Sequence, residues 1–372
     1  MTLPRSKYVR DGEEGVYHCY TRCVRRAFLC GYDPVTGRDF SHRKALIVKR
    51  LEFLASIFAI DVCAYSVMET HLHDILRLRP DLASAWSDHE VATRWLTLYP
   101  RKKKIPLEIQ ISALSSCPGR IAKLRRRLSS LSWFMGRLNE HIARLANKED
   151  DVKGHFWESR FKCQALLDDA AIAACMAYVD LNPIRAGQAA TPEESDFTSI
   201  QERIRAWGKL NLVHDAIPSD SIQNNPSVSS NSPIQQTTNE ADGFNSLLKS
   251  TPTLSSDSTS AHWLCPIQST PLRRGILPMT EAEYFDLVDR SGRILRTDKR
   301  GAMDPNLAPI LLRIGARPEA WTDTVSHFGS RFHLAAGLIS SLRRFADQIG
   351  SRWLTGIKSA RAAFAANPNR AV

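Results

Sequence analysis

The sequence lacks any apolar run long enough to cross a membrane. No stretch approaches the roughly 18 consecutive apolar residues that a transmembrane helix requires. The first residues, "MTLPRSKYVRDGEEG", also lack the apolar segment that follows the basic residues of a secretory signal peptide. We therefore expect a protein that stays in the cytoplasm and has no membrane partner.

Paired cysteine motifs are also missing. The eight cysteines contain no CxxC pair and show no repeated spacing. This excludes the usual patterns of a zinc ribbon and of a disulfide framework. We expect reduced thiols that are mostly buried.

Acidic residues are scarcer than basic ones. The chain has 50 Lys and Arg against 39 Asp and Glu, which gives a net charge of +11 and a pI near 9.4. A balance of this kind favours a polyanionic partner, and nucleic acid is the leading candidate.

Aromatic residues almost disappear between residues 210 and 262, where Ser, Asn, Gln, Thr and Pro dominate. Such a composition is typical of a linker. At 372 residues the chain is long enough for two domains. We predict a first domain at 1–209, a linker at 210–262, and a smaller, basic and mostly helical domain at 263–372.

Hydrophobic periodicity and turn residues predict the elements of the first domain. Asp168 and Asp169 are both suitable N-caps for a helix that must stop before Pro183. The resulting order describes an α+β fold with helices packed on an antiparallel sheet. The expected strands are 14–23, 59–68, 71–78 and 161–166, and the expected helices are 41–58, 81–98, 118–147 and one beginning at 168 or 169.

Two histidines stand one residue apart in the third expected strand. Successive side chains alternate along a strand, so His71 and His73 share one face while Leu72 and Asp74 point the other way. Two imidazoles on one face form half of a metal site. Exposed or simply hydrogen-bonded histidines are the alternative interpretation of this motif.

A second pair of polar residues occurs near the end of the last helix. Tyr178 and Asn182 are four residues apart and therefore lie on one helix face. Tyr178 could be a nucleophile and Asn182 an oxygen ligand of a metal. Alternatively, the tyrosine packs in the core and the Asn-Pro pair only ends the helix.

Four motifs occur in a fixed order: "GVYHCYTR", "AYSVMETHLH", "GHFWESRFK" and "YVDLNPIRAG". Together they resemble the single-tyrosine HUH transposases, in particular the REP-associated tyrosine transposases. The resemblance covers most of residues 10–200 and implies a ferredoxin-like HUH core. It departs from the family at Thr70, where Asn is common, and at Asp74, where an apolar residue is usual.

The resemblance also implies site residues and a reaction. His71, His73 and Asn182 would bind a divalent metal, Mg²⁺ or Mn²⁺, and Tyr178 would attack single-stranded or hairpin DNA to give a covalent 5′-phosphotyrosine. Mn²⁺ accepts nitrogen ligands more readily than Mg²⁺. A replication initiator or relaxase, and a domesticated DNA-binding protein without cleavage activity, are the alternatives. Whether the protein is a monomer or a homodimer is left open.

Several residues are expected to contact DNA. Trp157 offers a face for a base, and Arg160 and Lys162 offer positive charge beside it. Arg185 lies in the tyrosine motif and is assigned to the same role. The alternative is that the aromatic rings are core and the cations a solvated edge. Further candidates are His18 and Arg22 near the site, the runs at 101–104 and 125–127 as phosphate contacts, and Arg343, Arg344, Arg352, Lys358 and Arg361 as the basis of a DNA-binding role for 263–372.

Overall fold

The fold is built on one sheet with helices on both faces. In the computed structural model, the described residues are 4–10, 12–24, 27–100, 105–215, 263–296, 308–352 and 354–364. The basic run at 101–104 and most of the expected linker, from 216 to 262, lie outside them.

The sheet has the strand order β2-β3-β1-β4-β5. Neighbouring strands are antiparallel except for β4 and β5, which pair in parallel. β2 and β3 form the expected hairpin, joined at Glu69 and Thr70. The strands are β1 (Gly15–Arg22), β2 (Ile60–Val67), β3 (His71–Leu78), β4 (Lys162–Leu166) and β5 (Ala335–Ala336).

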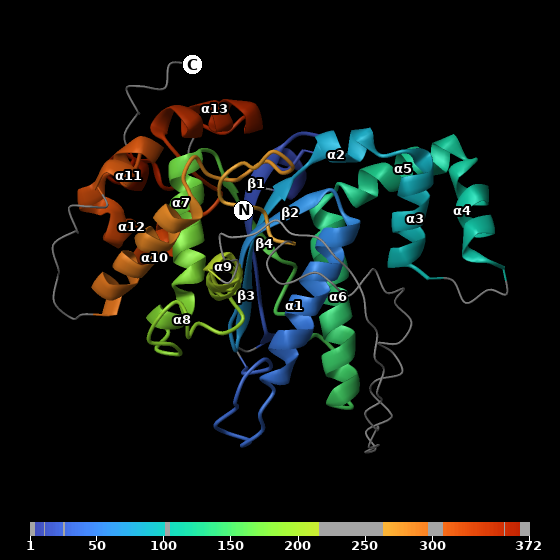
Figure 1. The fold of residues 1–372 in the computed structure, drawn as a ribbon, viewed down its shortest axis with the longest axis horizontal. Coiled ribbons are helices and arrows are strands. Elements are labelled where there is room, and N and C mark those ends of the chain that lie inside the picture. Colours follow the sequence, from blue (N-terminus) through green and yellow to red (C-terminus); the bar gives the residue numbers. More distant parts are fainter. Residues whose placement is uncertain are drawn as a thin grey trace, which may run out of the picture.

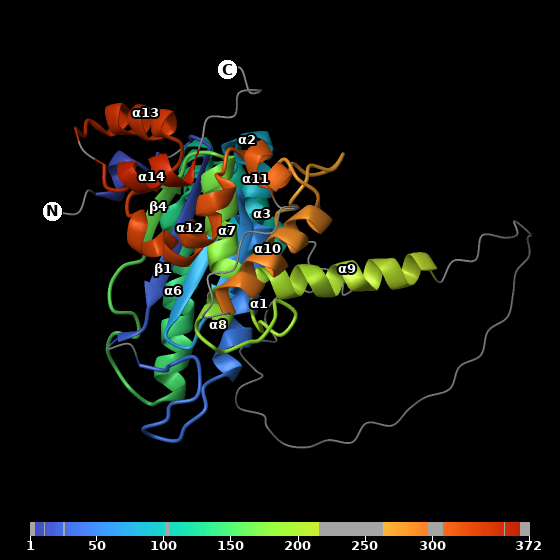
Figure 2. The ribbon, with the colours of Figure 1, turned by 90° about the vertical axis from the view of Figure 1, so that its left-hand side faces the viewer.

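The helices form two layers, one on each side of the sheet (Figures 1 and 2). α1 and α6 cover one face, and α7 covers the other, with α10, α11 and α12 packed against it. The helices of the first part of the chain are α1 (His42–Ile57), α2 (Pro80–Ala85), α3 (Asp88–Leu98), α4 (Leu107–Ser115), α5 (Pro118–Leu128), α6 (Leu131–Glu149), α7 (Asp169–Asp180), α8 (Asn182–Arg185) and α9 (Ser199–Asp215), after a short 3-10 turn at Arg5–Lys7. Those of the last part are α10 (Glu281–Arg296), α11 (Ala308–Ile314), α12 (Pro318–Arg331), α13 (Ile339–Ile349) and α14 (Ile357–Ala363).

Two expected helices are each divided in two, and α4 was not expected at all. The helix expected at 118–147 breaks because Ser130 is extended and the Leu128 carbonyl accepts a hydrogen bond from the Ala59 amide. The helix expected at 81–98 breaks at Trp86, whose carbonyl accepts from Arg125. Both breaks depend on partners distant in the sequence.

In the last part of the chain, which was expected to be mostly helical, β5 separates α12 from α13. The amides of Ala165 and Leu167 donate to the carbonyls of Leu334 and Ala336, which draws this segment to the edge of the sheet. Gly337 follows at a positive φ of 158°, which favours glycine. Pairing with β4 therefore replaces the helix here.

The last part of the chain shares its core with the first. The buried apolar side chains of both form one continuous cluster. The Cys265 amide donates to the Val62 carbonyl, and Arg77 donates to the carbonyls of Arg274 and Gly275. The division into two domains stays a prediction. α9 continues to Asp215, beyond residue 210, where the linker was expected to begin. No proline interrupts this helix before Pro218.

All eight cysteines are free thiols, and all but Cys117 are buried. Six of them lie in adjacent pairs. Cys19 stands directly opposite Cys163 between β1 and β4. The thiols of Cys23 and Cys30, and those of Cys63 and Cys265, lie close enough to shift each other's pKa. The expectation that the thiols are mostly buried is confirmed.

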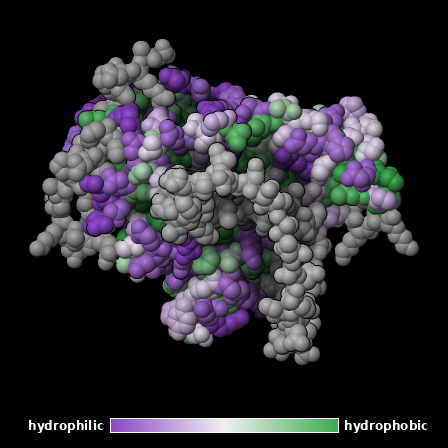
Figure 3. Space-filling view, viewed as in Figure 1, coloured by the Kyte–Doolittle hydropathy of each residue, from purple (hydrophilic) through white to green (hydrophobic). Residues whose placement is uncertain are grey.

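Exposed apolar side chains gather at the start of α4. Ile105, Leu107 and Ile109 are about half exposed at the start of α4, at the end of the molecule where hydrophobic residues gather in Figure 3. Of the helices that the structure describes, none combines the length and the apolar character needed to span a bilayer.

Candidate active site

The histidine pair lies on the sheet face that α7 covers. His71 stands directly opposite Arg22 of β1, and His73 directly opposite Tyr20. The two imidazole centroids are 4.9 Å apart, and the rings are nearly perpendicular. Asp74, in contrast, pairs with Cys19 and points to the other face, as the alternation of side chains predicts.

Both histidines use Nδ1 for a contact inside the protein. Nδ1 of His73 is 2.8 Å from Nε2 of His18, and Nδ1 of His71 is 2.9 Å from the Thr70 hydroxyl. Burial lowers the pKa of His71 to about 4, with a further contribution from the charge of Arg22. Burial also lowers the pKa of His73 well below its usual value. The two rings are therefore neutral near pH 7, and their Nε2 atoms are the ones left for an external ligand.

Tyr178 reaches the same place from α7. Asp168 caps this helix, and its carboxyl accepts a hydrogen bond from the Ala171 amide. The Tyr178 ring centroid lies 5.6 Å from that of His73 and 6.0 Å from that of His18. The sequence thus places side chains from β1, β3 and α7 in one cluster.

The charge state of Tyr178 is set by two opposing effects. Burial raises the pKa of its phenol, and the Arg185 guanidinium lowers it. Burial is the larger effect, so the phenol keeps its proton near pH 7. The guanidinium lies 4.9 Å from the centre of the Tyr178 ring and also donates to the Ser326 carbonyl of α12.

α12 forms a wall on the far side of Tyr178. The rings of Phe328 and Tyr178 are 6.0 Å apart. A Cβ atom placed on Gly329 would lie 2.9 Å from the Tyr178 hydroxyl oxygen, so only glycine allows this close approach. Nothing in the sequence pattern predicts that this late segment of the chain meets the tyrosine.

Asn182 opens α8, one turn after Tyr178. Its side chain is 8% exposed, and its amide nitrogen Nδ2 has no hydrogen-bond partner among the described residues. Pro183 follows in the first turn of α8, where its missing N–H breaks no hydrogen bond within the helix. The described residues contain no group of three or more His, Cys, Asp or Glu side chains arranged to hold a metal ion. The assignment of His71, His73 and Asn182 to a metal stays a prediction.

Positive charge surrounds the histidine face. Lys162 stands opposite Tyr20, and its ammonium lies 5.5 Å from the centre of that ring. Arg160 is exposed and shares a hollow with Arg22 and Lys162. Nε of Arg22 is buried without a hydrogen-bond partner in the described part of the chain. The hollow is also lined by Glu158, and the assignment of Arg160 and Lys162 to DNA stays a prediction.

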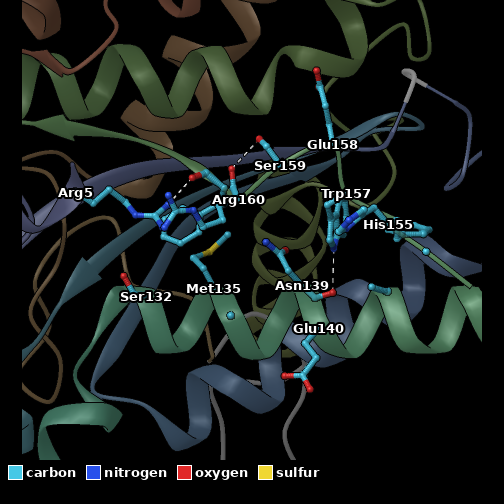
Figure 4. Close-up of a pocket in the computed structure, with 15 residues that line it drawn as sticks. Arg5, Ser132, Met135, Asn139, Glu140, His155, Trp157, Glu158, Ser159 and Arg160 are labelled. Atoms are coloured by element: carbon cyan, nitrogen blue, oxygen red, sulfur yellow. Dashed lines mark hydrogen bonds between the residues drawn. The ribbon is translucent and has the colours of Figure 1, made fainter. Parts of the chain in front are cut away.

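Trp157 lies on the other side of the sheet. Its indole N–H donates to the Asn139 carbonyl of α6, and its side chain is only 9% exposed (Figure 4). It lines a pocket of about 490 Å³ between α6 and the 154–161 segment, together with Arg5 and Arg160. The ring would have to move before a base could stack on it, and its assignment to DNA stays a prediction.

The other basic clusters have different surroundings. Arg125 donates to the carbonyls of Ala83 and Trp86, and the Arg127 guanidinium lies over the Trp133 ring, so these two cations hold α5 in place. The five basic residues expected near the end of the chain are all exposed: Arg343, Arg344, Arg352, Lys358 and Arg361.

His18 was expected only near the site, and the structure places it inside the cluster, 2% exposed. The sequence feature that could have identified His18 as part of the cluster is the spacing of His18, Tyr20 and Arg22, because the alternation of side chains puts all three on one face of β1. Gln164 was not identified as a site residue. It is a polar side chain in the buried strand β4, directly opposite His18.

No protein-family model matches the chain, and no curated protein matches it either. Among solved structures, the chain is similar to one titled "Structure of the REP associates tyrosine transposase bound to a REP hairpin". The alignment covers 63% of this chain and all of that one, at 13% identity and a TM-score of 0.33.

Proposed function

We propose that this chain is a metal-dependent tyrosine transposase that cleaves and rejoins single-stranded DNA. The observation that carries the proposal is the 5.6 Å approach of the Tyr178 ring to that of His73, with His71 beside it. A phenol next to two neutral imidazoles whose Nε2 atoms are available to a ligand combines a nucleophile with two of the ligands of a metal site.

The residues present fit a divalent cation. His71 and His73 offer Nε2, because their Nδ1 atoms are engaged. Asn182, which is buried, would add its amide oxygen Oδ1. Two imidazole nitrogens and an amide oxygen are suitable ligands for Mn²⁺. The same set could hold Mg²⁺ if water or phosphate oxygens completed its coordination. When bound, the ion would neutralise charge that develops on the scissile phosphate.

The chain's own residues account for the covalent step. The Tyr178 oxygen attacks phosphorus, and the bond from phosphorus to the 3′ oxygen breaks, which leaves a 5′-phosphotyrosine and a free 3′-hydroxyl. As it attacks, the phenol loses its proton to solvent, and the departing 3′ oxygen takes up a proton from solvent. The guanidinium of Arg185 stabilises the negative charge on the tyrosine oxygen. Attack by a 3′-hydroxyl on the phosphotyrosine reverses the step and joins a new strand.

The surroundings support DNA as the substrate. Arg22, Arg160 and Lys162 border the histidine face, and each can hold a backbone phosphate. Across the sheet, the first four strands lie in the order β4-β1-β3-β2, which suits the ferredoxin-like core implied by the sequence motifs.

Covalent trapping tests the proposal. Oligonucleotides copied from DNA flanking the gene and labelled at the 3′ end are incubated with the full chain and Mn²⁺, then separated under denaturing conditions. The wild-type chain should retain the label. Tyr178→Phe should bind the oligonucleotide but retain none, because the attacking oxygen is gone.

Tyr17→Phe is the matched control, since its hydroxyl donates to the Tyr8 carbonyl on the opposite face of the sheet. It should form the adduct. Binding without any wild-type adduct would favour the domesticated binding protein, and an adduct formed only with plasmid-origin DNA would favour an initiator or relaxase. An adduct with Tyr178→Phe would mean that another residue attacks.

A further inference from the structure

Tyr20 is an aromatic residue in the middle of the histidine face that the proposed reaction does not use. It stands directly opposite His73 of β3 on one side and opposite Lys162 of β4 on the other. The centroid of its ring is 5.7 Å from that of His73, with 32° between the planes, and 5.7 Å from that of His18, with 29° between the planes. Two imidazoles therefore hold this ring in place.

The exposure of these three rings differs. His18 and His73 are only 2% and 5% exposed, so neither can offer the face of its ring to a base. Tyr20 is half-buried, and its side chain lines the hollow beside the site. A ligand in that hollow therefore meets the tyrosine ring first.

The charge around the hollow favours a phosphodiester. Its lining holds three cations, Arg22, Arg160 and Lys162, against one carboxylate, that of Glu158. The Lys162 ammonium lies 5.5 Å from the centre of the Tyr20 ring. Proteins that bind single strands combine the same two features, since bases stack on the aromatic ring while the cations hold the backbone.

Other tyrosines of the sheet have structural roles that Tyr20 does not share. The Tyr17 hydroxyl donates to the Tyr8 carbonyl, and the Tyr65 hydroxyl donates to the Glu202 carboxylate. Both side chains are buried, at 6% and 2% exposure. The half-buried ring of Tyr20 lies instead beside a candidate metal ligand and an exposed lysine.

We propose that Tyr20 is a stacking platform for an unpaired base next to the scissile phosphate, with Arg22 and Lys162 holding the adjoining phosphates. The inference rests on the proposed function for the identity of the strand as DNA. Every base has a face that can stack, so Tyr20 adds affinity and orients the strand without selecting a sequence.

Photo-cross-linking tests the contact directly. The full chain is mixed in EDTA with single-stranded oligonucleotides copied from the DNA flanking the gene, in which 5-iodouracil replaces one base at a time. On irradiation, iodine leaves and the uracil carbon bonds to the aromatic ring on which it stacks. Mass spectrometry of the digested adduct should locate the bond on Tyr20, for one position or two adjacent positions of the strand.

Affinity for the same oligonucleotides gives a second readout, measured by fluorescence anisotropy in EDTA. Tyr20→Leu should weaken binding about 5- to 150-fold, the usual effect of losing one stacked base, and Tyr20→Phe should bind nearly as the wild type does. Tyr20→Leu should leave the slope of log K against log salt unchanged, because no phosphate contact is lost. Lys162→Gln should make that slope shallower by about 0.7.

Tyr99→Leu is the matched control. Tyr99 is also half-buried and stacks against an aromatic ring, that of Trp95 at 4.7 Å, but it lies at the end of α3, away from the histidine face. This variant should bind the oligonucleotides as the wild type does. Circular dichroism of Tyr20→Leu shows whether the variant is folded, and the cross-link to the wild-type chain does not depend on any variant.

Two results would overturn the inference: the absence of a cross-link to Tyr20 at every position of the strand, or equal affinities for the wild type and a folded Tyr20→Leu. A shallower salt slope in Tyr20→Leu would overturn it too, since the residue would then act through the phosphates. If Tyr20 cross-links and its ring is needed for binding while no covalent adduct forms at Tyr178, the platform stands and the proposed cleavage activity fails.

Discussion

The Tyr284 hydroxyl donates a hydrogen bond of 2.5 Å to Oδ2 of Asp180, two residues beyond the candidate nucleophile. Oδ1 of the same carboxyl accepts from the Ser199 hydroxyl and from the Ile200 amide. One buried carboxyl thus joins α7, α9 and α10. The end of the helix that carries Tyr178 is held by residues from both parts of the chain.

Asp180 should make stability depend on pH. Burial raises its pKa from 3.8 to about 6 in the folded protein. Between these values the folded state binds more protons than the unfolded state, so this group's contribution to stability falls as the pH rises from about 4 to about 6 and is constant above. The total is of the order of 3 kcal/mol, since one pKa unit corresponds to about 1.4 kcal/mol.

Urea unfolding of the wild type and Asp180→Asn between pH 4 and 7.5 checks this. The variant cannot titrate at this position, so the difference in unfolding free energy between the two proteins should shift in favour of the variant as the pH rises. A difference that does not vary with pH would contradict the raised pKa.

His71→Ala should remove the metal dependence of cleavage. The imidazole supplies an open Nε2, so its loss should slow cleavage by about 100-fold or more, since a catalytic metal contributes several kcal/mol. Added Mn²⁺ should no longer accelerate the reaction in single-turnover assays. His89→Ala, at an exposed position on α3, is the control. An unchanged response to Mn²⁺ in His71→Ala would place the metal elsewhere.

Gly329→Ala should displace Tyr178. The new Cβ would lie 2.9 Å from the Tyr178 oxygen, closer than a carbon atom normally approaches, so the phenol or α12 must shift. A shift of about 1 Å at a reacting group can cost up to about 100-fold in rate, while DNA affinity should be unchanged. Gly136→Ala on α6 is the matched control, because its Cβ would meet no atom within 4 Å. Equal cleavage rates for both variants would show that α12 does not position the tyrosine.

Asp74→Val should stabilise the protein. Both carboxyl oxygens of Asp74 are buried without a hydrogen-bond partner in the described part of the chain, and burial raises its pKa well above the usual value. Removing such a group should gain about 1–3 kcal/mol of unfolding free energy. Asp61→Val should have the opposite effect, because Asp61 pairs with Arg77 and Arg79. Urea unfolding at pH 8 compares them, and a destabilised Asp74→Val would reveal a partner for this carboxyl.

The basic cluster near the end of the chain should contribute to DNA affinity. Arg343, Arg344 and Arg361 are exposed, so changing all three to Gln should leave the fold intact. Hairpin binding should weaken, and the slope of log K against log salt should become shallower by about 0.9 for each lost duplex phosphate contact. Arg120→Gln with Lys123→Gln, at exposed positions on α5 outside the run 125–127, is the control. An unchanged slope would show that the cluster does not touch DNA.

Local signals in the sequence predicted much of the sheet and the direction of its side chains. Alternation placed His71 and His73 on one face, and the N-cap preference of Asp168 located the start of α7. Helix ends and strands that depend on residues distant in the sequence were not predicted. The break after Leu128 depends on Ala59, and β5 exists because β4 offers it a partner.

In the candidate site, too, residues with local sequence signals could be predicted, and residues that depend on distant contacts could not. Tyr178 and the histidines could be identified from spacing and from the resemblance of the motifs. Gln164 and Gly329 could not, because their importance comes from which atoms they meet across the sheet and from α12. Trp157 was assigned to base stacking from its sequence context, but the structure buries most of its side chain in the core.

The parallel pairing of β5 with β4 joins residues 165 and 335, which lie far apart in the chain. Closing so long a loop carries a large entropic cost and is slow compared with forming the antiparallel strands β1 to β4. During synthesis, those four strands and α7 emerge before α12 does. A nascent chain therefore exposes Tyr178 until its last segment folds back, and the order of translation makes the wall beside the nucleophile the final part of the site to assemble.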